Sequence, residues 1–392
     1  MKTKVLWHTF IGICLIVLLC PWISRPYFFD RGWRWPYLLF LSFLVTYFIT
    51  PFCRRLALRF NTLDSPDWRK IHDRPTPLLG GLAIYLGFSV SLLVNDVFLP
   101  DMKILLFGAT LIFLMGLWDD IRPLSASLKL LLQILISLLV IVWGEIYITL
   151  FYGESWAPII NIPLTVLWIV GLTNALNFFD GIDGLASGIS VVIALFLGLI
   201  AFKTDQPALG WVAVTLLGAS AGFMPYNFRI RGPALLFLGD AGSTFLGFSL
   251  AVLAISGKWS VSSHFVSFTS PILVFGILIF DMVYVNLSRI KNRKAGNLLG
   301  LLTCVNKDHL HHRLLFLGFT RKETVFVILT MSTCLGFSAL IVMNQKPLEA
   351  VLGLFQALLI LVLIVSLMLK GRDRIPPEGD RRLRSRRRED RM

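Results

Sequence analysis

Acidic and amide side chains recur at short intervals in the segment NALNFFDGIDGL, residues 174–185. Asn174, Asn177, Asp180 and Asp183 stand three residues apart. On a helix this spacing places them along one slowly drifting polar stripe. Polar groups beside a hydrophobic stretch are costly, and no Lys or Arg lies in the segment to pair with them. We therefore expect these side chains to bind a cation or a polar substrate; the alternative is a purely structural stripe.

Two further acidic sites lie before and after this segment. Asp119 and Asp120 are adjacent, and adjacent carboxylates repel each other unless a cation or protons lie between them. Lys129 follows nine residues after the second of them and could hold a phosphate. Asp240 lies in GDAGS, residues 239–243, where glycines permit a tight backbone and a helix N-terminus would favour an anion. The alternative for each site is a solvated helix end.

Histidine and basic residues concentrate in two other segments. LDSPDWRKIHDRPTPLLGG, residues 63–81, contains His72 among charged residues, and its prolines predict an extended loop. The second segment is KDHLHHR, and its candidate binding residues are His309, His311, His312 and Arg313. Zinc sites usually draw their ligands from more than one element, so a single run of histidines is weak evidence for zinc. We expect this segment to recognise an anion instead.

Long apolar segments must position these residues. The 392-residue chain is 56% hydrophobic and 15% charged, with a mean hydropathy of +0.75, whereas a soluble domain carries about 25% charged residues. This composition excludes a soluble or disordered chain. Twelve apolar segments are predicted, at 5–23, 36–58, 79–98, 103–118, 128–143, 160–177, 187–202, 209–225, 239–256, 268–287, 323–343 and 349–369. A membrane span needs about 20 residues, so we predict an all-α polytopic integral membrane protein with about 11–12 transmembrane helices.

The distribution of basic residues predicts the orientation in the membrane. With a cytoplasmic N-terminus, 30 of the 37 Lys and Arg residues fall in cytoplasmic segments and seven outside. All the candidate sites fall on the cytoplasmic side, so we expect a cytoplasmic-facing active-site cleft and a cytoplasmic C-terminus. The net charge of +14 then reflects retained cytoplasmic loops, and no nucleic-acid partner is expected. The five cysteines form no CxxC pair, so neither a zinc knuckle nor a redox motif is predicted.

Three remaining features need an interpretation. Segment 5–23 is expected to be a retained anchor rather than a signal peptide, because no small-residue cleavage site follows it. The basic tail 371–392 is expected to be disordered and attracted to anionic lipid. Asp281 is a carboxylate inside an apolar segment and must have a partner.

Four ordered motifs together carry a resemblance. RKIHDRPTPLLGG, WDD, NALNFFDGIDGLASG and FLGDAGSTFLGF are similar to those of the polyprenyl-phosphate N-acetylhexosamine-1-phosphate transferases, glycosyltransferase family 4. The resemblance covers about residues 36–345, and the HLHHR cluster is similar to that of the WecA/TagO-like branch. It implies three regions: an extra N-terminal segment and external loop at 1–35, a transferase membrane domain at 36–370, and a cytoplasmic tail at 371–392.

The resemblance also implies a reaction. Members of this family transfer N-acetylhexosamine 1-phosphate, here expected to be GlcNAc 1-phosphate, from a UDP-sugar to undecaprenyl phosphate, which releases UMP. The reaction begins cell-envelope polysaccharide synthesis at the bacterial inner membrane. Expected partners are the UDP-N-acetylhexosamine, undecaprenyl phosphate and membrane lipid, and a homodimer is a further option. The expected cofactor is Mg²⁺, with Mn²⁺ as an alternative.

The resemblance assigns roles by motif. The implied metal ligands are Asn177 and Asp240. The implied catalytic residues are Asp119, Asp120, Asp180 and Lys129. The implied substrate-binding residues are His72, Asn174, Asp183, His309, His311, His312 and Arg313, with Asp183 reading uracil and the histidine segment reading the sugar and diphosphate.

Several alternatives stay open at the level of sequence. The donor could be UDP-MurNAc-pentapeptide or another UDP-sugar. The reaction could proceed by direct attack of the lipid phosphate, or in two steps through an aspartyl-phosphate on Asp119 or Asp120. A transporter or flippase is less favoured, because transporters bind near the midplane of repeated halves and no repeat is visible here.

Overall fold

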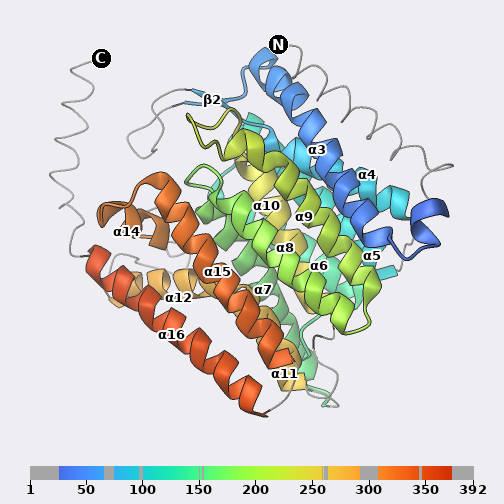
Figure 1. Ribbon diagram of the computed structural model, residues 1–392, viewed down its shortest axis with the longest axis vertical. Coiled ribbons are helices and arrows are strands. Elements are labelled where there is room, and N and C mark those ends of the chain that lie inside the picture. Colours follow the sequence, from blue (N-terminus) through green and yellow to red (C-terminus); the bar gives the residue numbers. More distant parts are fainter. Residues whose placement is uncertain are drawn as a thin grey trace.

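The structure is a computed structural model that describes residues 26–65, 75–96, 100–149, 151, 154–257, 259, 264–291, 308–343 and 347–372. These residues are almost entirely helical (Figure 1). The helices are α3 (Arg34–Arg59), α4 (Gly80–Asn95), α5 (Pro100–Ile121), α6 (Ala126–Gly144), α7 (Ala157–Phe179), α8 (Leu185–Lys203), α9 (Pro207–Asn227), α10 (Gly239–Ser256), α11 (His264–Val274), α12 (Gly276–Lys291), α14 (Leu310–Phe316), α15 (Arg321–Met343) and α16 (Pro347–Arg372). Two short strands, β1 (Leu63–Asp64) and β2 (Thr76–Pro77), pair antiparallel.

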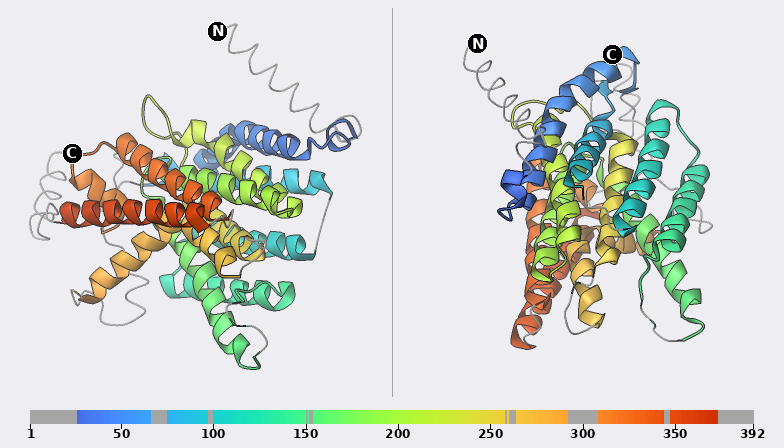
Figure 2. Two further views of the ribbon diagram at one scale, coloured as in Figure 1. Left: turned by 60° about the horizontal axis from the view of Figure 1, so that its bottom comes forward. Right: turned by 90° about the vertical axis from the view of Figure 1, so that its right-hand side faces the viewer.

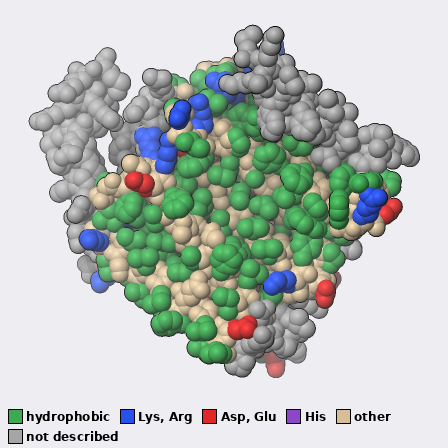
Figure 3. Space-filling model, in the orientation of Figure 1, with side chains coloured by type: hydrophobic (Ala, Val, Ile, Leu, Met, Phe, Trp, Pro, Cys, Tyr) green, Lys and Arg blue, Asp and Glu red, His purple; other side chains and the backbone are tan. Residues whose placement is uncertain are grey.

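Within the described part of the chain, nine helices are long and apolar enough to cross a membrane: α3, α5, α6, α7, α8, α9, α10, α15 and α16. The apolar α4 is shorter. The long helices run side by side in the right-hand view of Figure 2. Hydrophobic side chains cover most of the face in Figure 3, and charged side chains lie toward its edges. The predicted all-α polytopic membrane fold is confirmed.

One predicted element differs from the structure. The apolar segment predicted over 268–287 is not a single helix, because α11 ends at Val274 and α12 begins at Gly276. Pro271 lies inside α11, four residues before the interruption. Gly276 begins α12 directly after the interruption, and glycine is a poor helix former, so this residue weakens helix continuation here.

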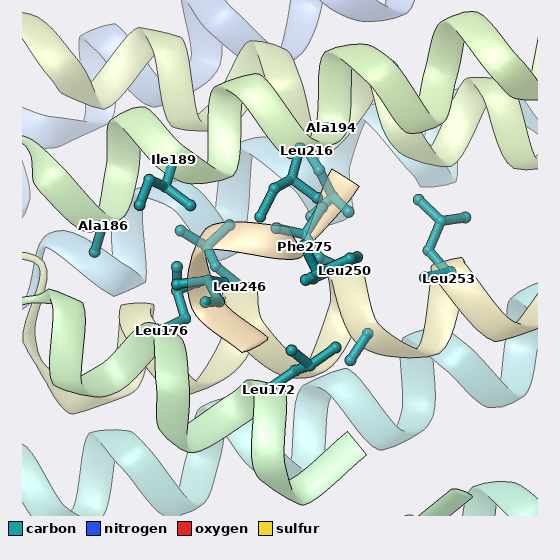
Figure 4. Packing of buried hydrophobic residues seen from close by; sticks show 14 of the residues in the cluster. Leu172, Leu176, Ala186, Ile189, Ala194, Leu216, Leu246, Leu250, Leu253 and Phe275 are labelled. Atoms are coloured by element: carbon teal, nitrogen blue, oxygen red, sulfur yellow. The ribbon is translucent and has the colours of Figure 1, made fainter. Parts of the chain in front are cut away.

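Helix α10 lies in the middle of the bundle. It packs against α4, α5, α7, α8 and α9, and nearly all of its side chains are buried. Figure 4 shows Leu246, Leu250 and Leu253 of this helix among apolar side chains of α7, α8 and α9. Since the first turn of α10 carries GDAGS, the packing places that motif where several other helices end.

Glycines permit the closest helix approaches around α10. A Cβ atom on Gly81 would lie 2.2 Å from the backbone nitrogen of Gly242, and one on Gly116 would lie 2.6 Å from Cα of Ala241. Any larger residue would therefore push α4 or α5 away from the start of α10. In addition, the amides of Gly80 and Gly81 donate to the carbonyls of Phe237 and Leu238, at 3.0 and 2.8 Å. These contacts fix where α4, α5 and α10 begin or end relative to one another.

Some predictions fall outside the described residues. They concern segment 5–23, His72 and the tail beyond Arg372. The division into three regions stays a prediction.

Candidate active site

The end of α5 holds the start of α10. The Asp120 carboxylate accepts hydrogen bonds from the backbone amides of Asp240, at 2.8 Å, and Ala241, at 3.0 Å. The amides of the first helical turn have no intrahelical acceptors, and a carboxylate is favoured at this positive end of the helix. Asp120 therefore acts as an N-terminal cap supplied by a different helix. Gly239 has φ of +76°, and a Cβ there would lie 2.6 Å from the Asp120 carboxylate.

The neighbouring carboxylate of Asp119 has different partners. It accepts from the amide of Leu124 at 2.6 Å and from Lys129 Nζ at 2.5 Å. Lys129 Nζ also contacts Asp240 Oδ2 at 2.8 Å, so one ammonium group lies between two carboxylates. Asp119 is buried, at 6% side-chain exposure, whereas Lys129 and Asp240 keep 28% and 32%. The last two side chains are therefore open to a ligand.

Asn177, in the last turn of α7, contacts the other oxygen of the Asp240 carboxylate. Its Nδ2 donates to Asp240 Oδ1 at 3.0 Å and to Ser243 Oγ at 2.8 Å. The amide oxygen of Asn177 takes part in neither contact. Asp240 is thus held by Lys129 on one oxygen and by Asn177 on the other, and the three residues come from α6, α7 and α10.

The polar stripe predicted over residues 174–185 is only half correct. Helix α7 ends at Phe179, so Asp180 caps it and Asp183 lies in the following turn. The Asn174 side chain has another partner: its Nδ2 donates to Gln133 Oε1 of α6 at 2.6 Å. The part of the prediction that covers Asp180 and Asp183 is wrong because the Asp-Gly pairs of the motif end the helix; glycine favours turns, and Gly184 has φ of +81°.

The turn after α7 is fastened by its own polar contacts. Asp183 Oδ2 accepts from the amide of Ala234 at 3.0 Å. Asn227 Oδ1 accepts from the amide of Gly184 at 2.8 Å. Loss of solvent and the nearby carboxylates of Asp240 and Asp120 raise the pKa of the Asp180 carboxyl well above its ordinary value. Asp180 can therefore retain a proton closer to neutral pH than an exposed aspartate does.

The histidine segment packs on the end of α7. The ring of His309 stacks on Phe178, with 5.1 Å between ring centroids, and His311 meets Phe179 edge-on at 5.6 Å. A Cβ on Gly181 would lie 3.0 Å from His311 Nε2, so the absence of a side chain there admits the imidazole. Burial and the neighbouring His312 and His309 lower the pKa of His311 well below its ordinary value.

Arg313 and Asp281 have partners that the sequence did not reveal. Arg313 is buried, and its guanidinium donates to the carbonyl of Met368 in α16, at 2.5 Å. The structure thus turns this side chain toward α16 rather than toward Asp240. Asp281 binds His309 Nδ1 at 2.6 Å, which supplies the partner that an intramembrane carboxylate requires.

The structure therefore brings together most of the predicted residues. Those around the start of α10 are Asp119, Asp120, Lys129, Asn177, Asp180 and Asp240, and His309 and His311 lie against the end of α7 beside them. Sequence reasoning missed Gln133, Ser243 and Asn227. Ser243 could have been found, because it stands one turn after Gly239 in the GDAGS motif, whereas the other two carry no local signal.

The donor set fits a hard divalent cation that shares its coordination with a substrate. Among the described residues, no group of three or more His, Cys, Asp and Glu side chains could hold a metal ion. Magnesium does not require such a group, because it is usually bound through one or two carboxylates together with waters and phosphate oxygens. The Asp240 carboxylate and the amide oxygen of Asn177 match that requirement.

Carboxylates, a lysine and histidines gather where several of the membrane-crossing helices end. This arrangement defines a polytopic membrane enzyme with an ionic site. Residues 102–258 match the sequence model of Glycosyl transferase family 4. A "Probable undecaprenyl-phosphate N-acetylglucosaminyl 1-phosphate transferase" of Bacillus subtilis is 33% identical over 309 residues, 77% of this chain and 83% of that protein. The chain belongs to glycosyl transferase family 4, as its motifs predicted.

Two other relatives extend the comparison. A "Decaprenyl-phosphate N-acetylglucosaminephosphotransferase" of Mycolicibacterium smegmatis is 29% identical and covers 84% of this chain and 88% of its own length. The "Undecaprenyl-phosphate alpha-N-acetylglucosaminyl 1-phosphate transferase" of Escherichia coli K12 is 27% identical, over 75% of this chain and 79% of its own length. The predicted transferase class is confirmed, and the alternative of a transporter or flippase is not supported.

Proposed function

We propose that this protein transfers GlcNAc 1-phosphate from UDP-GlcNAc to a polyprenyl phosphate, undecaprenyl phosphate in the first instance, and releases UMP. The observation that carries the proposal is the cluster of Asp119, Lys129, Asn177 and Asp240 at the start of α10. The names of the three relatives supply the sugar and the polyprenyl acceptor. The hydrophobic bundle suits an acceptor that reaches the site from the bilayer.

Magnesium is the proposed cofactor, with Mn²⁺ as the alternative. Asp240 and Asn177 would hold it, and the ion would neutralise charge on the diphosphate as the phosphorus–oxygen bond to UMP breaks. Lys129 adds a fixed positive charge at the same place. Its ammonium group has three donors, and the contacts with Asp119 and Asp240 use two of them, which leaves one for a phosphate oxygen.

Direct attack is the mechanism that the geometry favours. In a two-step route, Asp119 or Asp120 would have to attack phosphorus through a carboxylate oxygen. Each oxygen of Asp120 accepts an amide of α10, each oxygen of Asp119 accepts from Leu124 or Lys129, and the Asp119 side chain is only 6% exposed, so both carboxylates are weakened as nucleophiles. In the direct route a phosphate oxygen of the acceptor attacks the sugar-linked phosphorus, and UMP departs with the bonding electron pair.

The proposed setting is a bacterial plasma membrane, with the site and the C-terminus on the cytoplasmic side. The support is the excess of Lys and Arg in the segments on that side. A periplasmic reporter enzyme fused after Trp259 should be active, and one fused after Arg372 should not. The opposite pattern would overturn the orientation while leaving the reaction untouched.

A transfer assay with purified full-length protein tests the reaction. UDP-GlcNAc labelled with ³²P at the sugar-linked phosphate is incubated with undecaprenyl phosphate and Mg²⁺, and labelled lipid is the expected product. UDP-GalNAc and UDP-MurNAc-pentapeptide serve as competing donors, and faster labelling from either would reassign the sugar. Exchange of labelled UMP into UDP-GlcNAc without any lipid acceptor would reveal the two-step route, and we expect none.

A further inference from the structure

A buried carboxylate on α12 organises the start of α14. Asp281 Oδ2 lies 2.6 Å from Nδ1 of His309, and Asp281 Oδ1 accepts the backbone amide of Leu310 at 2.7 Å. Asp281 has no measurable exposure and His309 has 4%. One carboxylate thus binds both the side chain of His309 and the first amide of the helix that follows it.

This contact decides which nitrogen of His309 carries a proton. A carboxylate can only accept, so Nδ1 must be protonated, and Nε2 is then the nitrogen left to meet a ligand. Nε2 of His309 is buried and has no hydrogen-bond partner in the structure. A buried polar atom without a partner is costly, which is expected where a ligand completes the hydrogen bonding.

The place of this nitrogen connects it with the ionic site. The His309 ring stacks on Phe178, which directly follows Asn177 in the last turn of α7. The parallel ring of His311 lies 6.0 Å away. His309 therefore lies against the same last turn of α7 that carries Asn177, whose side chain contacts Asp240. Asp281 reaches that turn through His309.

We propose that Asp281 is a positioning residue for His309: it fixes the tautomer and the ring orientation that present Nε2 to the nucleotide-sugar donor. The proposal rests on the function proposed above. Carboxylates that bind the second nitrogen of a metal-ligating histidine set its tautomer in this way, and their loss typically lowers metal affinity or activity about 10- to 100-fold; we expect an effect of the same order here. Asp281 would act on the reaction only through His309.

The substitution Asp281→Asn separates this role from mere anchoring of α14. The amide oxygen of Asn can still accept from Leu310, so the cap remains. Its NH₂ group then faces Nδ1 of His309, and the proton must move to Nε2. We expect kcat to fall about 10- to 100-fold, with the thermal midpoint close to that of the wild type. If Asp281 only anchors the helix, the midpoint falls while turnover below that temperature stays within about twofold.

A double-mutant cycle with His309→Gln tests whether Asp281 affects kcat through His309. If Asp281 acts through His309, adding Asp281→Asn to His309→Gln causes no further loss of kcat. Multiplying losses would contradict the proposal. The matched control is Asp308→Asn. Asp308 directly precedes His309, and its carboxylate pairs with Arg289 at 3.7 Å, so this variant also removes one negative charge close to His309. We expect that variant to retain turnover within about twofold.

The tautomer can also be read without any enzyme assay. The chain has six histidines, so ¹⁵N-histidine labelling gives few signals, and that of His309 is the one missing in His309→Gln. We expect an Nδ1-protonated ring in the wild type, with an Nε2 signal that shifts when UDP-GlcNAc is added. An Nε2-protonated wild-type ring, or no shift, would overturn the proposal even if Asp281→Asn fails to fold. An Nδ1-protonated ring in a protein that labels no lipid would instead overturn the proposed reaction.

Discussion

Individual carboxylates that look alike in the sequence have different tasks in the site. Asp119 and Asp120 are adjacent, yet one pairs with Lys129 and the other caps α10. Asp240 is the carboxylate that both Lys129 and Asn177 contact, and it keeps about a third of its side chain exposed. Chemistry that needs a ligand-accessible anion therefore centres on Asp240.

Replacing Asp240 by Asn should abolish most turnover. The substitution keeps the shape but removes the negative charge that Lys129 and the proposed metal require. We expect a loss of at least about 100-fold, the size seen when a strong transition-state contact is removed. Turnover measured against Mg²⁺ concentration is the check, and excess Mg²⁺ should restore part of it. The matched control is Asp205→Asn in the exposed turn after α8. Normal turnover of Asp240→Asn at low Mg²⁺ would refute the assignment of Asp240 as a metal ligand.

Replacing Asp120 by Asn should act through structure rather than through chemistry. An Asn has only one acceptor oxygen, so one of the two amides of α10 would face an NH₂ group. The loss of a charged hydrogen bond costs about 1–3 kcal/mol. We expect the thermal midpoint and turnover to fall together in the same purified sample. Lost turnover at an unchanged midpoint would show that Asp120 takes part in the reaction itself.

At the scale of elements, the sequence predicts helices well and their contacts poorly. The long apolar runs were enough to predict nearly all the membrane helices of the described residues, whereas the orientation taken from the Lys/Arg distribution stays a prediction. The break after Val274 and the end of α7 at Phe179 depend on a few Gly residues that the apolar pattern masked. Pairs such as Lys129 with Asp240 join positions 111 residues apart, and no local periodicity encodes them.

Gly81 offers a test of how tightly these elements must meet. A methyl group there would lie 2.2 Å from the backbone of Gly242, and backbone cannot move as a side chain can. We expect Gly81→Ala to lower the stability by about 1–3 kcal/mol, as overpacking does, and to reduce turnover by separating α4 from the start of α10. Thermal unfolding in detergent gives the measurement. Gly171→Ala in α7 is the control, because a Cβ at Gly171 meets nothing within 4 Å.

At the scale of the whole molecule, the C-terminal helix belongs to the site's support. Arg313, which ends the histidine motif, donates to the carbonyl of Met368, and Met368 is fully buried. Helix α16 thereby fastens α14, the helix that begins just after His309 and carries His311. The basic residues after Arg372 belong to no motif. The boundary between dispensable and required chain should therefore lie between Met368 and Arg372.

Two truncations locate that boundary. A chain ending at Arg372 keeps the Met368 carbonyl, so we expect wild-type turnover per folded molecule in detergent, even if less protein is retained in membranes. A chain ending at Leu367 leaves the buried Arg313 guanidinium short of an acceptor, which costs about 1–3 kcal/mol or more for a charged group. We expect it to unfold at lower temperature and to bind UDP-GlcNAc more weakly, because α14 loses its support. Equal stability and equal KM for the two truncated proteins would show that α16 does not support the site, whereas inactivity of the longer one would assign a catalytic part to the tail.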